Sequence, residues 1–139
     1  MRKVTLILVH CSAVKPDQTS SAKQIDAWHK ALGWSGIGYH YVVRRDGTVE
    51  KGRDESLVGA HCAGRNRHSI GVCYEGGLEA KGKPADTRTP EQKESLLRLL
   101  ADLRQRHPQA LIMSHHTFNP RKACPCFSAE NEYKVLQPK

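Results

Sequence analysis

The chain has 139 residues and a formal net charge of +8. This length fits one domain with a core of its own, and no apolar run approaches the ~18 residues of a membrane span. The basic balance favours an anionic partner, such as nucleic acid, anionic lipid or an acidic cell-wall polymer, but charge alone does not choose among them.

The first half of the chain alternates strand and helix signals. The run Val4–Val9 is apolar and rich in β-branched residues, which predicts a buried strand ending at His10. Residues 19–33 follow with serine and threonine caps, one apolar face and a terminal glycine, so they predict a helix. Residues 39–45 predict a strand, and Asp46-Gly47 predicts a hairpin turn into a short return strand.

The second half continues this alternation. Residues 53–66 predict mostly loop, and residues 69–74 predict a strand. Thr89 begins a helix as N-cap of a capping box with proline at the first helical position, and this helix ends before Pro108. A strand over 110–114 and a closing helix over 128–136 complete the pattern. We therefore expect an α/β (α+β) fold, with a central mixed sheet and about three helices, as a single domain over residues 1–139.

A metal site is predicted from the stretch 114–127, which holds two histidines, two cysteines and a lysine. A catalytic zinc is usually held by three protein ligands, with the fourth position left to water. His10 and His115 each close an apolar run, so parallel neighbouring strands would carry both imidazoles to one sheet edge. Cys124 would be the third ligand, with Cys126 as the alternative.

Eight short motifs occur in a fixed order along most of the chain. They are VHCSA at 9–13, GIGYHY at 36–41, RDGTV at 45–49, GR at 52–53, VGAH at 58–61, SIGV at 69–72, HH at 115–116 and KACP at 122–125. In order and spacing they resemble the type 2 family of zinc-dependent N-acetylmuramoyl-L-alanine amidases. Animal peptidoglycan recognition proteins form another branch of this family.

The resemblance implies one zinc ion and hydrolysis of the amide between the lactyl group of N-acetylmuramic acid and L-alanine in peptidoglycan. It places the zinc ligands on His10, His115 and Cys124, with His116 as an alternative to His115. The family's catalytic tyrosine falls on Tyr39 and its catalytic lysine on Lys122.

Two further residues are candidates for substrate contact. His61 matches the family's segment near the substrate groove, and a loop histidine without such a role is the alternative. Asn66 lies in a basic loop that could contact glycan or the carboxylates of the stem peptide, although a solvated loop is an equally good reading.

The predicted chemistry uses these residue types. Zinc lowers the pKa of bound water to about 7 and polarises a carbonyl, so amide hydrolysis can proceed near neutral pH. Lys122, close in sequence to Cys124, would stabilise the oxyanion of the tetrahedral intermediate. Tyr39 would hold the attacking water or help to move its proton.

Three function classes are compatible with the sequence. A phage or prophage endolysin is favoured because Lys122 and Cys124 are both present. The alternatives are a non-catalytic peptidoglycan-binding module and a regulator of RNA polymerase, an activity that a related phage enzyme has. We expect a monomer that binds peptidoglycan and neither nucleic acid nor membrane. We also expect synthesis in the cytoplasm without a signal peptide, with action on the wall after release or delivery.

Overall fold

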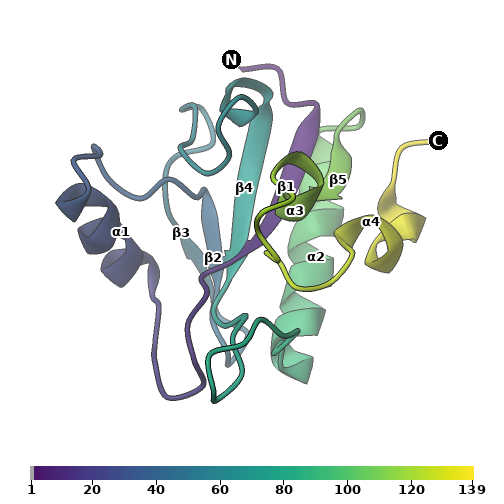
Figure 1. Ribbon diagram of the computed structural model, residues 1–139. Coiled ribbons are helices and arrows are strands. Elements are labelled where there is room, and N and C mark those ends of the chain that lie inside the picture. The colour runs from purple at the N-terminus through teal and green to yellow at the C-terminus, as the bar shows by residue number, and fades with distance from the viewer. Residues whose placement is uncertain (1) are drawn as a thin grey trace.

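The computed structural model describes residues 2–139 and is built on one five-stranded sheet (Figure 1). The strands are β1 (Leu6–Cys11), β2 (Tyr41–Val43), β3 (Val49–Lys51), β4 (Ser69–Tyr74) and β5 (Leu111–Ser114), in the spatial order β3-β2-β4-β1-β5. β1 is parallel to both β4 and β5, β2 is parallel to β4, and β3 is antiparallel to β2. The predicted mixed sheet is therefore confirmed.

The two long helices begin where the capping signals predicted. The helices are α1 (Ala22–Ala31), α2 (Pro90–Arg106), α3 (His115–Phe118) and α4 (Ala129–Glu132), with 3-10 turns η1 (Asn66–His68) and η2 (Lys134–Leu136). Ser21 and Thr89 each form a complete capping box. Among residues 2–139, no helix combines the length and the apolar character needed to cross a membrane.

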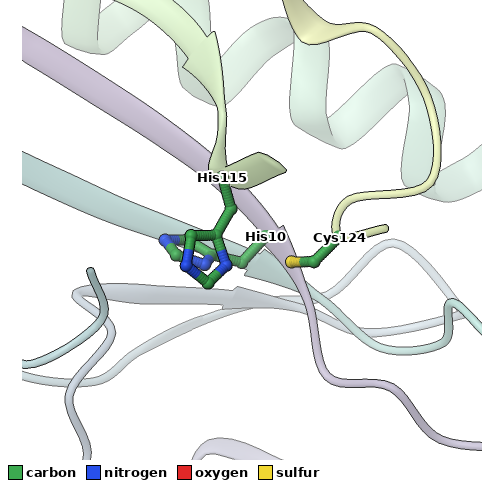
Figure 2. A group of neighbouring side chains, drawn as sticks. All are labelled: His10, His115 and Cys124. Atoms are coloured by element: carbon green, nitrogen blue, oxygen red, sulfur yellow. The ribbon is translucent and has the colours of Figure 1, made fainter. Parts of the chain in front are cut away.

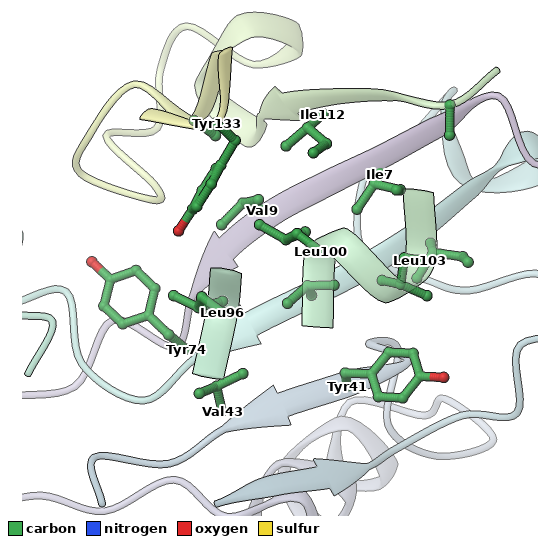
Figure 3. Close-up of a cluster of buried hydrophobic side chains, with 14 of the residues drawn as sticks. Ile7, Val9, Tyr41, Val43, Tyr74, Leu96, Leu100, Leu103, Ile112 and Tyr133 are labelled. Carbon is green, nitrogen blue, oxygen red and sulfur yellow. The ribbon is translucent and has the colours of Figure 1, made fainter. Parts of the chain in front are cut away.

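One face of the sheet is covered by α2 (Figure 3). The side chains of Leu96, Leu100 and Leu103 are fully buried against residues of the strands that include Ile7 and Val9. Full burial of each such leucine contributes on the order of 1.5–3 kcal/mol. This side of the sheet is the main core, and the loop residue Cys124 packs against its edge.

The opposite face positions the site. Side chains alternate along a strand, so Ile7 and Val9 point to α2 while His10 points to the other side of β1. On that other side, Ile25 of α1 packs with Val42 of β2 and Cys73 of β4. The histidine of β1 is thus delivered to the face on which α1 lies.

The predicted strand over 39–45 is shorter in the structure, where β2 has only Tyr41–Val43. The chain before Tyr41 runs close to the backbone at Ala60. A Cβ on Gly38 would lie only 2.1 Å from the carbonyl oxygen of Ala60. This segment still pairs with the return strand, since the N–H of Gly52 donates to the carbonyl of His40 at 2.8 Å.

The closing helix predicted over 128–136 is also different. It is divided into the single turn α4 and the 3-10 turn η2 at Tyr133. Tyr133 is buried, and its hydroxyl accepts a hydrogen bond from Arg88 at 3.1 Å. Anchoring this side chain in the core takes precedence over a continuous helix. With α3, which was not predicted, the described chain has four α-helices where about three were expected.

Candidate metal centre

His10 and His115 are brought together by the pairing of β1 with β5. The two strands are parallel neighbours, with Val9 opposite Ser114 in the register. His10 lies near the end of β1 and His115 opens α3 directly after β5. Their ring centroids are 4.4 Å apart. The sheet-edge arrangement predicted from the two apolar runs is the one that the structure has.

Cys124 reaches this pair from the loop that follows α3. The backbone N–H of His116 donates to the carbonyl of Cys124 at 2.9 Å, which fixes the loop. The backbone N–H of Cys11 donates to the sulfur of Cys124 at 3.0 Å. One ligand atom from each of His10, His115 and Cys124 lies within 4.8 Å of the others (Figure 2).

The donor atoms of this group fit zinc. Within residues 2–139, the buried side-chain nitrogens and oxygens that lack a hydrogen-bond partner are Nδ1 of His10 and Nδ1 of His115. Buried polar atoms without partners are rare, so two of them at one place fit a site at which a metal ion would be held. Two imidazole nitrogens and one thiolate are a usual zinc ligand set.

The electrostatic surroundings keep both imidazoles neutral, which is the form that binds metal. Burial lowers the pKa of His10 well below its ordinary value, and the neighbouring His61 and His115 add to this effect. Burial also lowers the pKa of His115, and the positive charge of Lys122 acts in the same direction.

The two alternative ligands lie outside the group. The ring of His116 is turned to the carbonyl oxygen of Cys124, 3.3 Å from its Nδ1. Cys126 donates its S–H to the carbonyl of Gly77 at 3.3 Å, and its sulfur lies 4.0 Å from that of Cys11. The geometry therefore favours His115 over His116 and Cys124 over Cys126 as metal-binding residues.

The two predicted catalytic residues approach the group from different elements. The ring of Tyr39 lies 5.0 Å from that of His10. Burial, together with the thiols of Cys73 and Cys124, raises the pKa of Tyr39 well above its ordinary value, so its hydroxyl stays protonated. Lys122 is exposed and lines a hollow beside the Cys124 loop together with His116.

A groove of about 290 Å³ opens beside the group of His10, His115 and Cys124. Its lining includes His29, Trp34, Tyr39, His61, Asn66 and His115. The Oδ1 of Asn66 accepts the backbone N–H groups of His61 and Cys62, both at 2.9 Å, and so shapes the groove wall. Both predicted substrate-binding residues thus line the groove, and their contact with substrate stays a prediction.

His61 is buried between the groove and the sheet. Its Nδ1 lies 2.9 Å from Nε2 of His10, and its Nε2 lies 3.1 Å from Oγ of Ser69. Burial, with the neighbouring imidazoles of His40 and His115, lowers the pKa of His61 to about 3, so the ring is neutral near pH 7.

A larger cavity of about 800 Å³ lies elsewhere, between the N-terminal segment at Arg2 and Val4 and the residues that follow α2 at His107. The group of histidine and cysteine ligands is not part of its lining. Volume alone would direct attention to this cavity, but the group of His10, His115 and Cys124 lies beside the smaller groove.

Two residues that support the site were not predicted to take part in it. His29 of α1 accepts the N–H of Gly38 at 2.9 Å and lies 5.7 Å from the ring of Tyr39. Its position four residues after the buried Ile25, on the same helix face, was a usable signal. Glu130 accepts hydrogen bonds from the N–H of Ser114 at 3.1 Å and its hydroxyl at 2.8 Å. No pattern in the sequence links these two positions.

Comparison with known proteins identifies the family of the chain. Residues 1–127 match the family described as N-acetylmuramoyl-L-alanine amidase. The endolysin of Escherichia phage T7 is 50% identical over 121 residues, which are 87% of this chain and 80% of the relative. The endolysin of Enterobacteria phage K11 is 45% identical over 134 residues, covering 96% of this chain and 88% of the relative.

A solved structure shares the whole fold. The N-acetylmuramoyl-L-alanine amidase LysC from Clostridium intestinale superposes with a TM-score of 0.82 at 31% identity, covering 99% of this chain and 88% of that chain. The chain belongs to the N-acetylmuramoyl-L-alanine amidase family, as the sequence motifs predicted. It is accordingly a peptidoglycan amidase.

Proposed function

We propose that the protein is an endolysin that uses one zinc ion, held by His10, His115 and Cys124, to hydrolyse the amide between the lactyl group of N-acetylmuramic acid and L-alanine. The observation that carries this proposal is the convergence of two unpartnered Nδ1 atoms and one thiol beside a groove. We also propose that residues 1–139 form one catalytic domain and act as a monomer on the wall.

When bound at this site, zinc would lower the pKa of water to about 7 and polarise the scissile carbonyl. Tyr39 then has a separate task in our proposal. Its hydroxyl remains protonated and its ring packs on that of His10, so it can orient the attacking water and relay its proton.

Lys122 supplies positive charge to the reaction. It is exposed on the Cys124 loop and acts on the imidazole of His115 through its charge. A tetrahedral intermediate at the amide carbon carries an oxyanion, and an ammonium group aimed at that oxygen stabilises the transition state. We therefore assign Lys122 as the oxyanion donor.

The groove would hold the substrate. Trp34 is partly exposed in its lining and offers an apolar surface, and Asn66 and His61 also line it. The net charge of +8 supports additional attraction to anionic wall polymers. An enzyme is favoured over a non-catalytic binding module because all three metal-binding side chains, Tyr39 and Lys122 are present together.

The test is mass spectrometry of the fragments that the protein releases from purified peptidoglycan. The expected products are free stem peptides that begin at L-alanine, beside intact glycan strands. Release should stop after chelation and return when zinc is added. Products cut within the glycan or within the peptide would contradict the proposed bond, and unchanged release by the chelated protein would contradict the proposed metal.

A further inference from the structure

We propose that His61 is a positioning residue for His10, which holds the metal-binding nitrogen of that imidazole in its required orientation and tautomer. The inference rests on the proposed zinc site. Its basis is a buried contact of 2.9 Å between Nε2 of His10 and Nδ1 of His61. Residues that hydrogen-bond to a metal-binding histidine fix its ring and raise its strength as a ligand.

The proton assignment follows from the contacts. If Nδ1 of His10 binds the metal, the neutral ring carries its proton on Nε2. That N–H is donated to Nδ1 of His61, which must then be unprotonated at this atom. The proton of His61 is consequently on Nε2, where Oγ of Ser69 accepts it at 3.1 Å. One assignment therefore satisfies the whole chain from His10 to Ser69.

The fold makes room for the ring of His61 with two glycines. A Cβ on Gly71 of β4 would lie 2.6 Å from the ring, and a Cβ on Gly59 would lie 2.7 Å from it. Real Cβ atoms do not come this close, so any other residue at either position would displace the imidazole. The rings of His10 and His61 meet edge-on, with an interplanar angle of 89°.

The backbone of His61 is fixed as well. Its N–H donates to Oδ1 of Asn66 at 2.9 Å, which ties it to the start of η1. Backbone and both ring nitrogens are thus held, and the ring nitrogens are engaged inside the protein. This role differs from the substrate contact predicted from the sequence, because His61 would act on the metal through His10.

Two substitutions separate these roles. In His61→Asn the side-chain oxygen can occupy the position of Nδ1 and still accept from His10. In His61→Gln the longer amide reaches the position of Nε2, so it can contact Ser69 while the acceptor for His10 is lost. Both variants therefore keep a polar side chain at position 61, but it can hydrogen-bond to His10 in the first and to Ser69 in the second.

The measurement is the zinc dissociation constant, obtained by competition with a chromogenic chelator. The absorption spectrum of the cobalt-substituted protein reports ligand geometry, and thermal melting of the metal-free variants checks folding. We expect His61→Gln to weaken zinc binding by about 10–100-fold and to alter the cobalt spectrum. His61→Asn should recover most of the affinity.

Unchanged zinc affinity in His61→Gln, with only KM raised, would overturn the inference in favour of substrate contact. If His61→Gln does not fold, the test is made with Ser69→Ala. This variant removes the acceptor of the Nε2–H of His61, so the proton of the ring is no longer held on Nε2. Zinc binding should then weaken several-fold. An unaltered affinity in Ser69→Ala would then overturn it.

Failure of the zinc site itself is distinguishable. In that case the wild-type protein binds zinc no better than Cys124→Ser, and the inference falls together with the proposed function. If the wild-type protein binds zinc through Cys124 and His61→Gln binds it equally well, only the role of His61 is wrong.

Discussion

The backbone N–H of Cys11 donates a hydrogen bond to the sulfur of Cys124 at 3.0 Å, across a separation of 113 residues. This contact joins the end of β1, which carries His10, to the loop that carries the third proposed zinc ligand. The site is therefore assembled by long-range pairing, and its parts are tested separately below.

Removal of the ammonium group at position 122 tests the oxyanion assignment. Lys122→Ala should lower kcat by about 10²–10³-fold, because a donor to the developing oxyanion is lost. Zinc content should stay the same, since Lys122 is not among the metal-binding residues. The neighbouring exposed Arg121→Ala is the matched control and should keep near-normal turnover. Near-normal turnover in Lys122→Ala would remove this role.

The hydroxyl of Tyr39 is tested by Tyr39→Phe, which keeps the ring on His10. We expect a loss of about 10²-fold in kcat, in the range typical of groups that move protons in the transition state. Thermal stability and zinc content, measured on the same preparation, should change little. A kcat within twofold of the wild-type value would show that the ring alone matters.

Acid should destabilise the fold through Glu55. Burial alone would raise the pKa of its carboxyl from the ordinary 4.5, but hydrogen bonds from Arg106, Tyr41 and His107 outweigh this and lower it to about 2. Because the folded-state pKa is depressed, the stabilisation is present above about pH 4.5 and is lost as the pH falls towards 2.

This prediction is checked by urea unfolding of the metal-free protein. The free energy of unfolding of the wild type should fall more steeply between pH 4.5 and pH 2 than that of Glu55→Gln. Glu94→Gln, at an exposed pair with Arg98, should follow the wild type. Identical slopes for the wild type and Glu55→Gln would contradict the assignment.

Retention on the wall should depend on salt. The chain has a net charge of +8, and the Debye length falls from about 10 Å at 0.1 M to about 3 Å at 1 M ionic strength. Sedimentation of chelated protein with purified cell walls should therefore yield less bound protein as salt rises. Walls stripped of anionic polymers provide the control. Retention that is insensitive to salt on intact walls would exclude a role for the basic surface.

Much of the fold was predictable because its signals are local. The capping boxes at Ser21 and Thr89 mark the starts of α1 and α2, and the β-branched run before His10 marks β1. The parallel pairing of β1 with β5, which brings His10 to His115, followed from two apolar runs that each end in a histidine.

The remaining features depend on contacts between segments that no local pattern connects. The break in the closing helix comes from burial of Tyr133 and its hydrogen bond with Arg88. The contact of His61 with His10 requires the loop after β3 to fold over Gly71, and a close approach of this kind is visible only in three dimensions.

The account is tested most directly by titrating zinc into the metal-free protein while the release of stem peptides from peptidoglycan is followed. The wild type and Cys126→Ser should gain activity in proportion to zinc and reach a plateau at one ion per chain. Cys124→Ser should stay inactive over the same range. Peptide release by the metal-free protein, or full activity in Cys124→Ser with loss in Cys126→Ser, would contradict the proposed centre.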